Sequence, residues 1–242
     1  GYGFSISSLE DSIKIYEKLY KNYEKNESLG IDYPTEALVI YISNLRKNKK
    51  NYFDDYNNEK SIKKNFKGKA LEIGFGSVAN LKMLQEKGYL CFGTEVSSEA
   101  IKRAKKLTKK IEFKLLKNSK LNYPKNNFDL IVGLQCIYYN LDIKKFIEKE
   151  VFKILKPGGK LIFSFFAKQH SYQKYIEKDT NGTSYFNKKL PNKRLIGAKL
   201  YAPKSKKELL DKFQIFKNVK LFTTKSDQTI FNETWWYVVA EK

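Results

Sequence analysis

The 242-residue sequence predicts an α/β fold in which a parallel sheet carries helices on both faces. From Ala70 onward, short apolar segments alternate with amphipathic segments, the pattern of successive strand–helix–strand units. The first apolar segment ends in a glycine-rich turn just before a helical pattern, as parallel strands and their helices are often joined. Apolar residues make up 41% of the chain, so it can form a buried core and disorder is excluded.

The residues that precede the alternating region are expected to form helices. Over 9–28 apolar residues recur at helical spacing, and Gly30 ends this pattern. A second helix is predicted over 35–46, with Thr35 in the capping position. A stretch rich in Lys and Asn, 47–69, follows and is predicted to be a loop with a short helix.

The chain is therefore divided into residues 1–66, a helical cap or substrate lid, and residues 67–242, the α/β domain. The predicted strands of this domain cover residues 70–75, 89–96, 111–116, 128–135, 160–166, 218–224 and 234–241. Its predicted helices cover residues 78–87, 97–110, 142–155 and 205–213. Residues 167–204 are polar, and we expect them to be irregular.

The chain is strongly basic, with 47 Lys and Arg against 26 Asp and Glu and a formal net charge of +21. One interpretation is an anionic partner such as nucleic acid, a nucleotide or an acidic membrane surface. The other is compositional, because almost all the excess is lysine spread along the chain. Arginine, which makes bidentate contacts with phosphates and bases, occurs only at Arg46, Arg103 and Arg194. This favours the compositional interpretation over a nucleic-acid partner.

The cysteines, the apolar runs and the first residues indicate in which cellular compartment the protein is found. Cys91 and Cys136 have no Cys-x-x-Cys or histidine spacing around them, so neither a disulfide framework nor a metal site is expected. The longest apolar run, 161–167, is much shorter than the roughly 18 residues of a membrane helix. The first residues have neither the basic nor the apolar region of a secretory signal. We therefore expect a cytoplasmic protein without a membrane span.

The glycine turn carries the clearest chemical signal. It reads Glu72-Ile73-Gly74-Phe75-Gly76 and lies between a buried strand and a helix. Glycines allow a ligand to approach the backbone, and the helix N-terminus offers N–H groups. About 20 residues on, Glu95 ends the second strand, where a carboxylate can accept hydrogen bonds from two ribose hydroxyls. The pattern predicts a cofactor that contains adenosine.

These segments resemble the class I S-adenosylmethionine-dependent methyltransferases in order and spacing. The resemblance rests on ALEIGFGSVANL, GTEVSSEAI, FDLIV and ILKPGGKLIF, and it covers about residues 69–242. It implies a Rossmann-like seven-stranded sheet in the order 3-2-1-4-5-7-6 with strand seven antiparallel. It also implies S-adenosylmethionine as methyl donor and S-adenosylhomocysteine as product. Val78 stands where the family usually has a third glycine, a departure that concerns helix packing more than the cofactor.

According to the resemblance, the residues at the carboxyl ends of the first and second strands bind the cofactor. Glu72, Gly74 and Gly76 would line its methionine part. Glu95 would hold the ribose, with Val96 beside the adenine.

The resemblance extends the cofactor site to the loops after the third and fourth strands. Asn118, next to Ser119, stands where the family often places an Asp against the adenine amino group, and its side-chain oxygen can accept the same bond. Gln135 and Cys136 would lie near the methionine and the methyl group.

Two residues are candidates for catalysis. His170, the only histidine, follows the fifth strand, and an ordinary pKa of about 6.5 would suit a general base. Its alternative role is to position the substrate or to lie on the surface. Tyr139 and its neighbour Tyr138 follow Cys136 and either line the pocket or serve in packing. Trp235 and Trp236 open the last strand and receive no catalytic role.

The segments after the fifth strand resemble those of methyltransferases that act on small molecules. We expect a small-molecule acceptor, such as a hydroxyl or amine of a sugar or nucleotide-linked sugar. The alternatives are an RNA methyltransferase, for which no RNA-binding module is evident, and a non-catalytic protein that binds the adenosyl cofactor.

Overall fold

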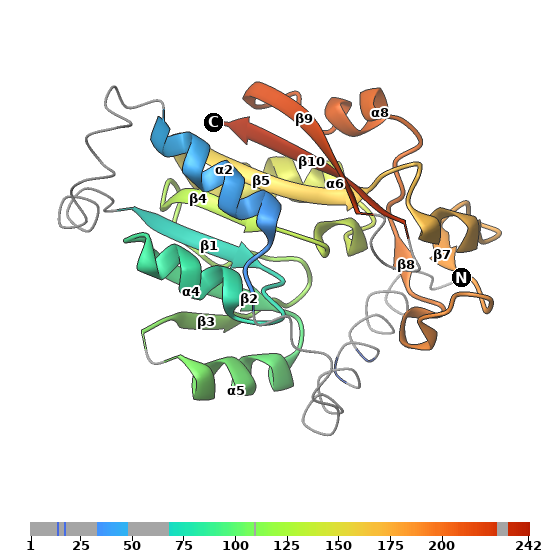
Figure 1. Ribbon diagram of the computed structural model, residues 1–242, viewed down its shortest axis with the longest axis horizontal. Coiled ribbons are helices and arrows are strands. Elements are labelled where there is room, and N and C mark those ends of the chain that lie inside the picture. Colours follow the sequence, from blue (N-terminus) through green and yellow to red (C-terminus); the bar gives the residue numbers. More distant parts are fainter. Residues whose placement is uncertain (1–13, 15–16, 18–32, 48–67, 109, 227–231) are drawn as a thin grey trace, which may run out of the picture.

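The computed structural model describes residues 14, 17, 33–47, 68–108, 110–226 and 232–242. Its centre is a seven-stranded sheet in the order β3-β2-β1-β4-β5-β10-β9 (Figure 1). The strands are β1 (Lys69–Ile73), β2 (Leu90–Glu95), β3 (Glu112–Leu115), β4 (Phe128–Gly133), β5 (Leu155–Phe166), β9 (Lys217–Ser226) and β10 (Glu233–Glu241). The first five pair in parallel, whereas β10 runs antiparallel to both β5 and β9.

The mixed α/β, Rossmann-like sheet agrees with the fold class predicted from the sequence. The numbering of the last two strands differs, because three further strands precede them in the chain. These are β6 (Ile176–Lys178), β7 (Ser184–Phe186) and β8 (Lys199–Leu200), which form a separate three-stranded sheet. The expectation that residues 167–204 are irregular is therefore wrong. Phe186 and Leu200 give this insertion its own buried apolar side chains.

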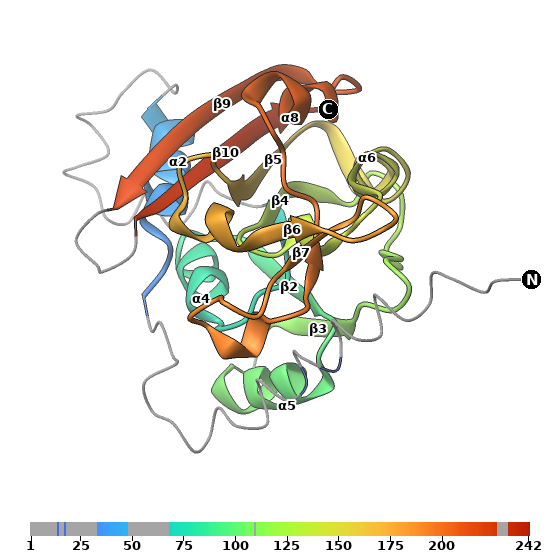
Figure 2. The same ribbon diagram turned by 90° about the vertical axis from the view of Figure 1, so that its right-hand side faces the viewer.

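Helices cover both faces of the large sheet. They are α2 (Glu36–Lys47), α4 (Ala79–Glu86), α5 (Ser98–Leu107), α6 (Ile143–Phe146), α7 (Phe152–Ile154) and α8 (Lys206–Asp211). Figure 2 shows α2 and α4 on one side of the strands and α6 on the other. The helix predicted over 142–155 contains a π-helical segment, Ile147–Val151, between α6 and α7. The helix predicted over 9–28 lies outside the described residues except for Lys14 and Glu17.

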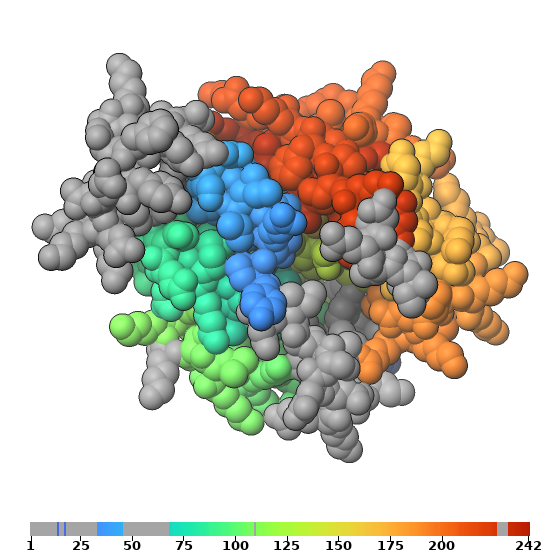
Figure 3. All heavy atoms as spheres, viewed as in Figure 1, coloured from blue at the N-terminus to red at the C-terminus, as the bar shows by residue number. Residues whose placement is uncertain are grey.

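Helix α2 packs on the sheet domain even though it precedes the alternating region. Thr35 comes directly before it, and its carbonyl accepts hydrogen bonds from the N–H groups of Leu38 and Val39. Leu38 and Ile42 are fully buried and belong to the same core as β1, β4 and β5. The outer side of α2 lies on the surface, between α4 and the C-terminal strands (Figure 3). The predicted second helix is thus confirmed, and the structure places it against the core.

The insertion lies beyond the carboxyl ends of the parallel strands, the edge at which open α/β sheets bind their ligands (Figure 1). It is fixed there by the backbone: the N–H of Tyr201 donates to the carbonyl of Tyr138, 2.6 Å away. A second bond joins the N–H of Ser171 to the carbonyl of Asn232 at 2.9 Å. Within the described part of the chain, none of the helices has the length and apolar character needed to span a membrane.

Candidate active site

The glycine turn after β1 is held in a conformation that suits glycine. Gly74 and Gly76 have φ angles of 66° and 51°, in the left-handed region that side chains disfavour. A Cβ on Gly74 would lie 2.6 Å from the Sγ of Cys136, which is closer than real Cβ contacts. The thiol of Cys136 in turn donates to the carbonyl of Ile73 at 3.0 Å. The ends of β1 and β4 therefore meet at Gly74.

Glu95 connects the end of β2 to this turn. Its Oε2 accepts a hydrogen bond from the N–H of Gly76 at 3.4 Å, and its Oε1 accepts one from the N–H of Val96 at 2.8 Å. The residue is buried, and burial raises the pKa of its carboxyl to about 7. Each carboxylate oxygen has a second lone pair, so Glu95 retains acceptor capacity for hydroxyl groups of a ligand.

Glu72 is a second buried carboxyl at the same place. Its Oε1 accepts a hydrogen bond from the Nδ2 of Asn80 at 2.8 Å, whereas its Oε2 has no partner among the described residues. Burial raises the pKa of Glu72 to about 8, despite the opposing effect of the Asn80 hydrogen bond. A buried acceptor without a partner is costly, and a cationic group would satisfy it. The site therefore has a place for a positive charge and, at Glu95, for hydroxyls.

Asn80 is not among the site residues predicted from the sequence. It is the second residue of α4 and is 9% exposed, on a helix whose other buried side chains are apolar. Its place could have been inferred from the sequence, because Asn80 is a polar residue on the apolar face of a predicted helix, and a buried amide needs hydrogen-bond partners.

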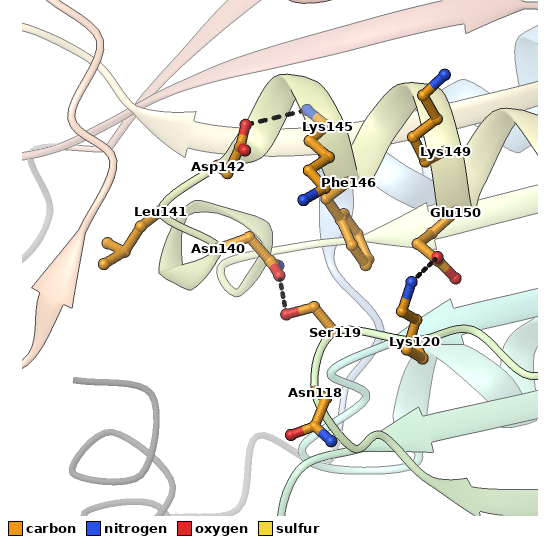
Figure 4. A pocket seen from close by; sticks show the side chains of 10 residues that line it. All are labelled: Asn118, Ser119, Lys120, Asn140, Leu141, Asp142, Lys145, Phe146, Lys149 and Glu150. Atoms are coloured by element: carbon orange, nitrogen blue, oxygen red, sulfur yellow. Dashed lines mark hydrogen bonds and ion pairs between the residues drawn. The ribbon is translucent and has the colours of Figure 1, made fainter. Parts of the chain in front are cut away.

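Asn118 and Ser119 lie in the loop after β3, with φ angles of 52° and 53°. They line a pocket of about 240 Å³ between this loop and the start of α6 (Figure 4). The hydroxyl of Ser119 donates to the Oδ1 of Asn140 at 2.8 Å across one end of the pocket. At the other end Lys120 pairs with Glu150. Asn118 itself is exposed, with no hydrogen-bond partner for its side chain in the described structure.

The loop after β4 places Gln135 and Cys136 beside the glycine turn. Gln135 has a φ of 57°, and its N–H donates to the buried hydroxyl of Ser164 on β5 at 2.7 Å. Burial raises the pKa of the Cys136 thiol well above its ordinary value, and Glu95 and Glu72 add to that rise. The thiol therefore stays protonated and serves as a donor to Ile73.

Tyr138 and Tyr139 form a short 3₁₀ turn that leads into an aromatic cluster. Their ring centroids lie 4.6 Å apart, and the ring of Tyr138 is 4.7 Å from that of Phe166 at the end of β5. Tyr138 is buried, while Tyr139 is half-buried at the border of the cluster.

His170 belongs to the same cluster and is 4% exposed. Its ring lies 4.7 Å from that of Phe166 and 4.9 Å from that of Trp235, edge-on to both. Its Nδ1 accepts the N–H of Tyr172 at 3.0 Å, so in the neutral ring the proton is on Nε2. That Nε2 and the Nε1 of Trp235 are buried donors without partners among the described residues. Burial lowers the pKa of His170 to about 4.

The predicted residues thus fall into two connected groups. Contacts between backbone and side chains bring Glu72, Gly74, Gly76, Glu95 and Cys136 together around the glycine turn. Tyr139 and His170 lie in the aromatic cluster that begins two residues after Cys136. Asn118 and Ser119 line the neighbouring pocket, with no hydrogen bond to either group in the described structure.

Comparison with known proteins agrees with this geometry. Residues 71–163, which contain the glycine turn, β2, β3, β4 and most of β5, match the family described as a methyltransferase domain. Among solved structures, an S-adenosylmethionine-dependent methyltransferase from Methanosarcina mazei is 21% identical, with a TM-score of 0.53. The match covers 73% of this chain and 92% of that chain.

Two other structures match over nearly the whole chain. The 1,6-didemethyltoxoflavin-N1-methyltransferase of Burkholderia thailandensis, solved with 1,6-didemethyltoxoflavin and S-adenosylhomocysteine bound, has a TM-score of 0.62 at 11% identity. It covers 100% of this chain and 92% of its own. A protein studied for the conversion of a disulfide bond into a thioacetal group during echinomycin biosynthesis has a TM-score of 0.65 at 14% identity. That match covers 95% of this chain and 91% of the other.

Proposed function

We propose that this chain, a class I S-adenosylmethionine-dependent methyltransferase, transfers the methyl group to a small molecule. The observation that carries the proposal is the insertion over 167–204. It forms its own sheet beyond the carboxyl ends of the parallel strands and is bonded to the loop after β4 through Tyr201 and Tyr138. Such a cover favours a compact acceptor over an extended polymer, because small ligands are mostly enclosed by their pockets.

The residues around the glycine turn fit the cofactor. The partnerless Oε2 of Glu72 suits the ammonium of its methionine part, and Gly74 and Gly76 allow it close to the backbone. In this assignment Glu95 accepts hydrogen bonds from the ribose hydroxyls. The adenine then lies near Val96, Asn118 and Ser119, and the methyl group lies near Gln135 and Cys136.

The reaction itself needs little chemistry from side chains. When bound, S-adenosylmethionine supplies a methyl carbon that is attacked by a lone pair of the acceptor, while the electrons of the broken C–S bond stay on sulfur. The acceptor oxygen or nitrogen loses a proton, and S-adenosylhomocysteine is the other product. The chain contributes mainly by holding the acceptor in line and excluding water.

The aromatic cluster supports an acceptor with hydroxyl groups. It presents two buried N–H donors, His170 Nε2 and Trp235 Nε1, among aromatic rings. Apolar and aromatic walls with a few placed donors are typical of small-ligand sites. A sugar or nucleotide-linked sugar matches this chemistry, since its hydroxyls accept hydrogen bonds and its C–H faces pack on rings.

The same geometry favours a donor role for His170 over the role of general base. A base needs a free lone pair, and in the neutral ring that lone pair is engaged by the N–H of Tyr172. A pKa lowered to about 4 also makes the ring a weak proton acceptor. Tyr139, at the border of the cluster, is the second candidate to contact the acceptor. The division into a cap over 1–66 and a catalytic domain over 67–242 is part of the proposal, with α2 as the described piece of the cap.

The matched structures add support of a general kind. The Burkholderia thailandensis enzyme, whose match covers 100% of this chain, is a 1,6-didemethyltoxoflavin-N1-methyltransferase with 1,6-didemethyltoxoflavin bound. The protein from echinomycin biosynthesis likewise covers the insertion as well as the sheet domain.

A labelling experiment tests the proposal. Purified protein is incubated with S-adenosylmethionine carrying a labelled methyl group and, in separate reactions, with a low-molecular-mass metabolite extract or with total RNA at physiological salt. We expect label in the metabolite fraction, and a panel of sugars and nucleotide-linked sugars then identifies the class. Label in RNA would establish the RNA methyltransferase alternative instead. Binding of cofactor without transfer to either fraction would favour the non-catalytic alternative, and Glu95→Ala serves as the control for background transfer.

A further inference from the structure

Asn80 joins three segments of the chain through one side-chain amide. Its Nδ2 donates to the Oε1 of Glu72 on β1 at 2.8 Å. Its Oδ1 accepts the backbone N–H of Thr35, the residue before α2, also at 2.8 Å. The amide lies at the start of α4 and is almost entirely buried.

The two partners fix the orientation of this amide. A backbone N–H can only donate, and the unpaired lone pairs of a carboxylate accept, so the amide oxygen faces Thr35 and the nitrogen faces Glu72. The N–H of Thr35 precedes the first helical turn and has no helical carbonyl to reach, which leaves Asn80 to satisfy it. Loss of the amide would leave the N–H of the half-buried Thr35 and an oxygen of the buried Glu72 unpaired at the same time.

The bond to Glu72 also decides which of its oxygens is available. With Oε1 engaged by Asn80, the other oxygen, Oε2, is left buried without a partner among the described residues. The rotamer of Glu72 that presents Oε2 to a ligand is therefore held by an amide that is itself anchored to the start of α2. Such a support fixes a binding group more tightly than the group's own rotamer preference.

We propose that Asn80 is a positioning residue that aligns Glu72 for the ammonium of the cofactor and couples this alignment to the docking of α2. The inference rests on the proposed cofactor contacts of Glu72. If α2 is docked, Asn80 is held and Glu72 is presented; if the Thr35 bond is lost, Glu72 samples other positions. Because coupling between two sites is reciprocal, cofactor binding also stabilises the docked α2.

Two ligands separate this role from a general effect on the fold. S-adenosylhomocysteine carries the ammonium, whereas methylthioadenosine has the same nucleoside and thioether without the amino-acid part. In Asn80→Ala, we expect affinity for S-adenosylhomocysteine to fall about tenfold, the size of a lost hydrogen bond to a charged group, with methylthioadenosine within about twofold of wild type. Isothermal titration calorimetry measures both.

A proline pair tests the link to α2. Thr35→Pro removes the N–H that reaches Asn80 together with the Thr35 hydroxyl, whereas Glu36→Pro keeps both and places the same ring at the first helical position, where proline is tolerated. We expect Thr35→Pro to lower the affinity for S-adenosylhomocysteine and Glu36→Pro to leave it unchanged. Thermal unfolding of all three variants establishes that they are folded at the titration temperature.

The possible results are distinguishable. Equal losses for both ligands in Asn80→Ala, or an unchanged affinity for S-adenosylhomocysteine, would overturn the positioning role. Equal behaviour of the two proline variants would overturn the coupling to α2. If the wild-type protein binds neither ligand, it is the proposed cofactor site that fails.

Discussion

The Oε2 of Glu95 accepts a hydrogen bond from the N–H of Gly76 at 3.4 Å, which joins the end of β2 to the turn after β1. Changing Glu95→Ala removes this bond and the proposed contacts to the ribose. We expect the affinity for S-adenosylhomocysteine to fall by more than about tenfold, because hydrogen bonds to charged groups contribute about 1.5–3 kcal/mol. Titration calorimetry measures it, with Glu112→Ala on the exposed face of β3 as the control. An unchanged affinity would show that Glu95 serves the turn alone.

The two buried carboxyls predict a pH dependence of stability. Burial raises the pKa of Glu72 to about 8 and that of Glu95 to about 7, from ordinary values of 4.5. Between pH 4.5 and its raised pKa, each carboxyl keeps a proton in the folded chain that it has lost in the unfolded chain. The free energy of unfolding therefore falls as pH rises, by up to about 1.4 kcal/mol per pH unit for each carboxyl. His170, with a lowered pKa, acts in the opposite direction only below about 6.5.

Urea unfolding between pH 6.5 and 8 therefore isolates the carboxyls. We expect the free energy of unfolding to decrease across this range in the absence of cofactor. Glu72→Gln should flatten the part of the decrease that lies above pH 7, where Glu95 has largely ionised. A wild-type curve that is level between pH 6.5 and 8 would contradict the buried environment of these groups.

The carboxyl of Glu72 also predicts a pH dependence of ligand binding. An ammonium is attracted to the ionised form of Glu72, so its affinity should rise as pH increases toward 8, with release of a proton on binding. Methylthioadenosine, which keeps the ribose but lacks the ammonium, should show only the dependence near pH 7 that Glu95 gives to both ligands. Titrations in two buffers of different ionisation enthalpy count the protons released. Parallel pH profiles for the two ligands would remove Glu72 from the ammonium site.

Most of the large sheet follows from local patterns. Most strand and helix segments from Lys69 to Phe166 agree with the sequence prediction to within about three residues, because buried parallel strands are continuous apolar runs between turn residues. The exception is β5, which begins at Leu155 and not at residue 160, because the predicted turn over 156–159 is part of the strand. The glycine turn and Glu95 were found for the same reason: their positions are defined by the ends of two such strands. The contact of Gly74 with Cys136 joins the ends of β1 and β4, which are far apart in the chain, so it is visible only in the folded structure.

The insertion and the polar partners were less accessible. Strands β6, β7 and β8 are only two or three residues long, too short for an alternating pattern to be recognised. The burial of His170 depends on Trp235 and Phe166, which approach it from different strands. Trp235 and Trp236 are both buried, because β10 is an interior strand with both faces covered. The burial of a side chain by residues that are distant in the sequence cannot be predicted from the spacing of its neighbours in the chain.

Gly74 and Cys136 make a steric prediction. Gly74→Ala should destabilise the fold, since its φ of 66° costs an alanine about 1–2 kcal/mol and its Cβ would lie 2.6 Å from Sγ of Cys136. In that background Cys136→Gly should restore part of the stability. Cys136→Ala should restore less, because the Cβ of residue 136 lies at 2.7 Å. Urea unfolding of the single and double variants measures the coupling, and additive effects would contradict the contact.

His170 offers a test that separates a donor from a base. Asparagine at this position keeps an acceptor for the N–H of Tyr172 but has no donor at the place of Nε2, whereas glutamine carries an N–H near that place. With the methyl acceptor identified by labelling, we expect His170→Asn to lower kcat/KM by about tenfold and His170→Gln to retain most of it, since only asparagine removes the donor at the place of Nε2. Glutamine instead removes the acceptor for the N–H of Tyr172, a loss that should lower thermal stability and not kcat/KM. Cofactor affinity should be unchanged in both, because the histidine lies in the aromatic cluster and not at the glycine turn. Equal and severe loss of kcat in both variants would instead support the base, because neither amide accepts a proton at neutral pH.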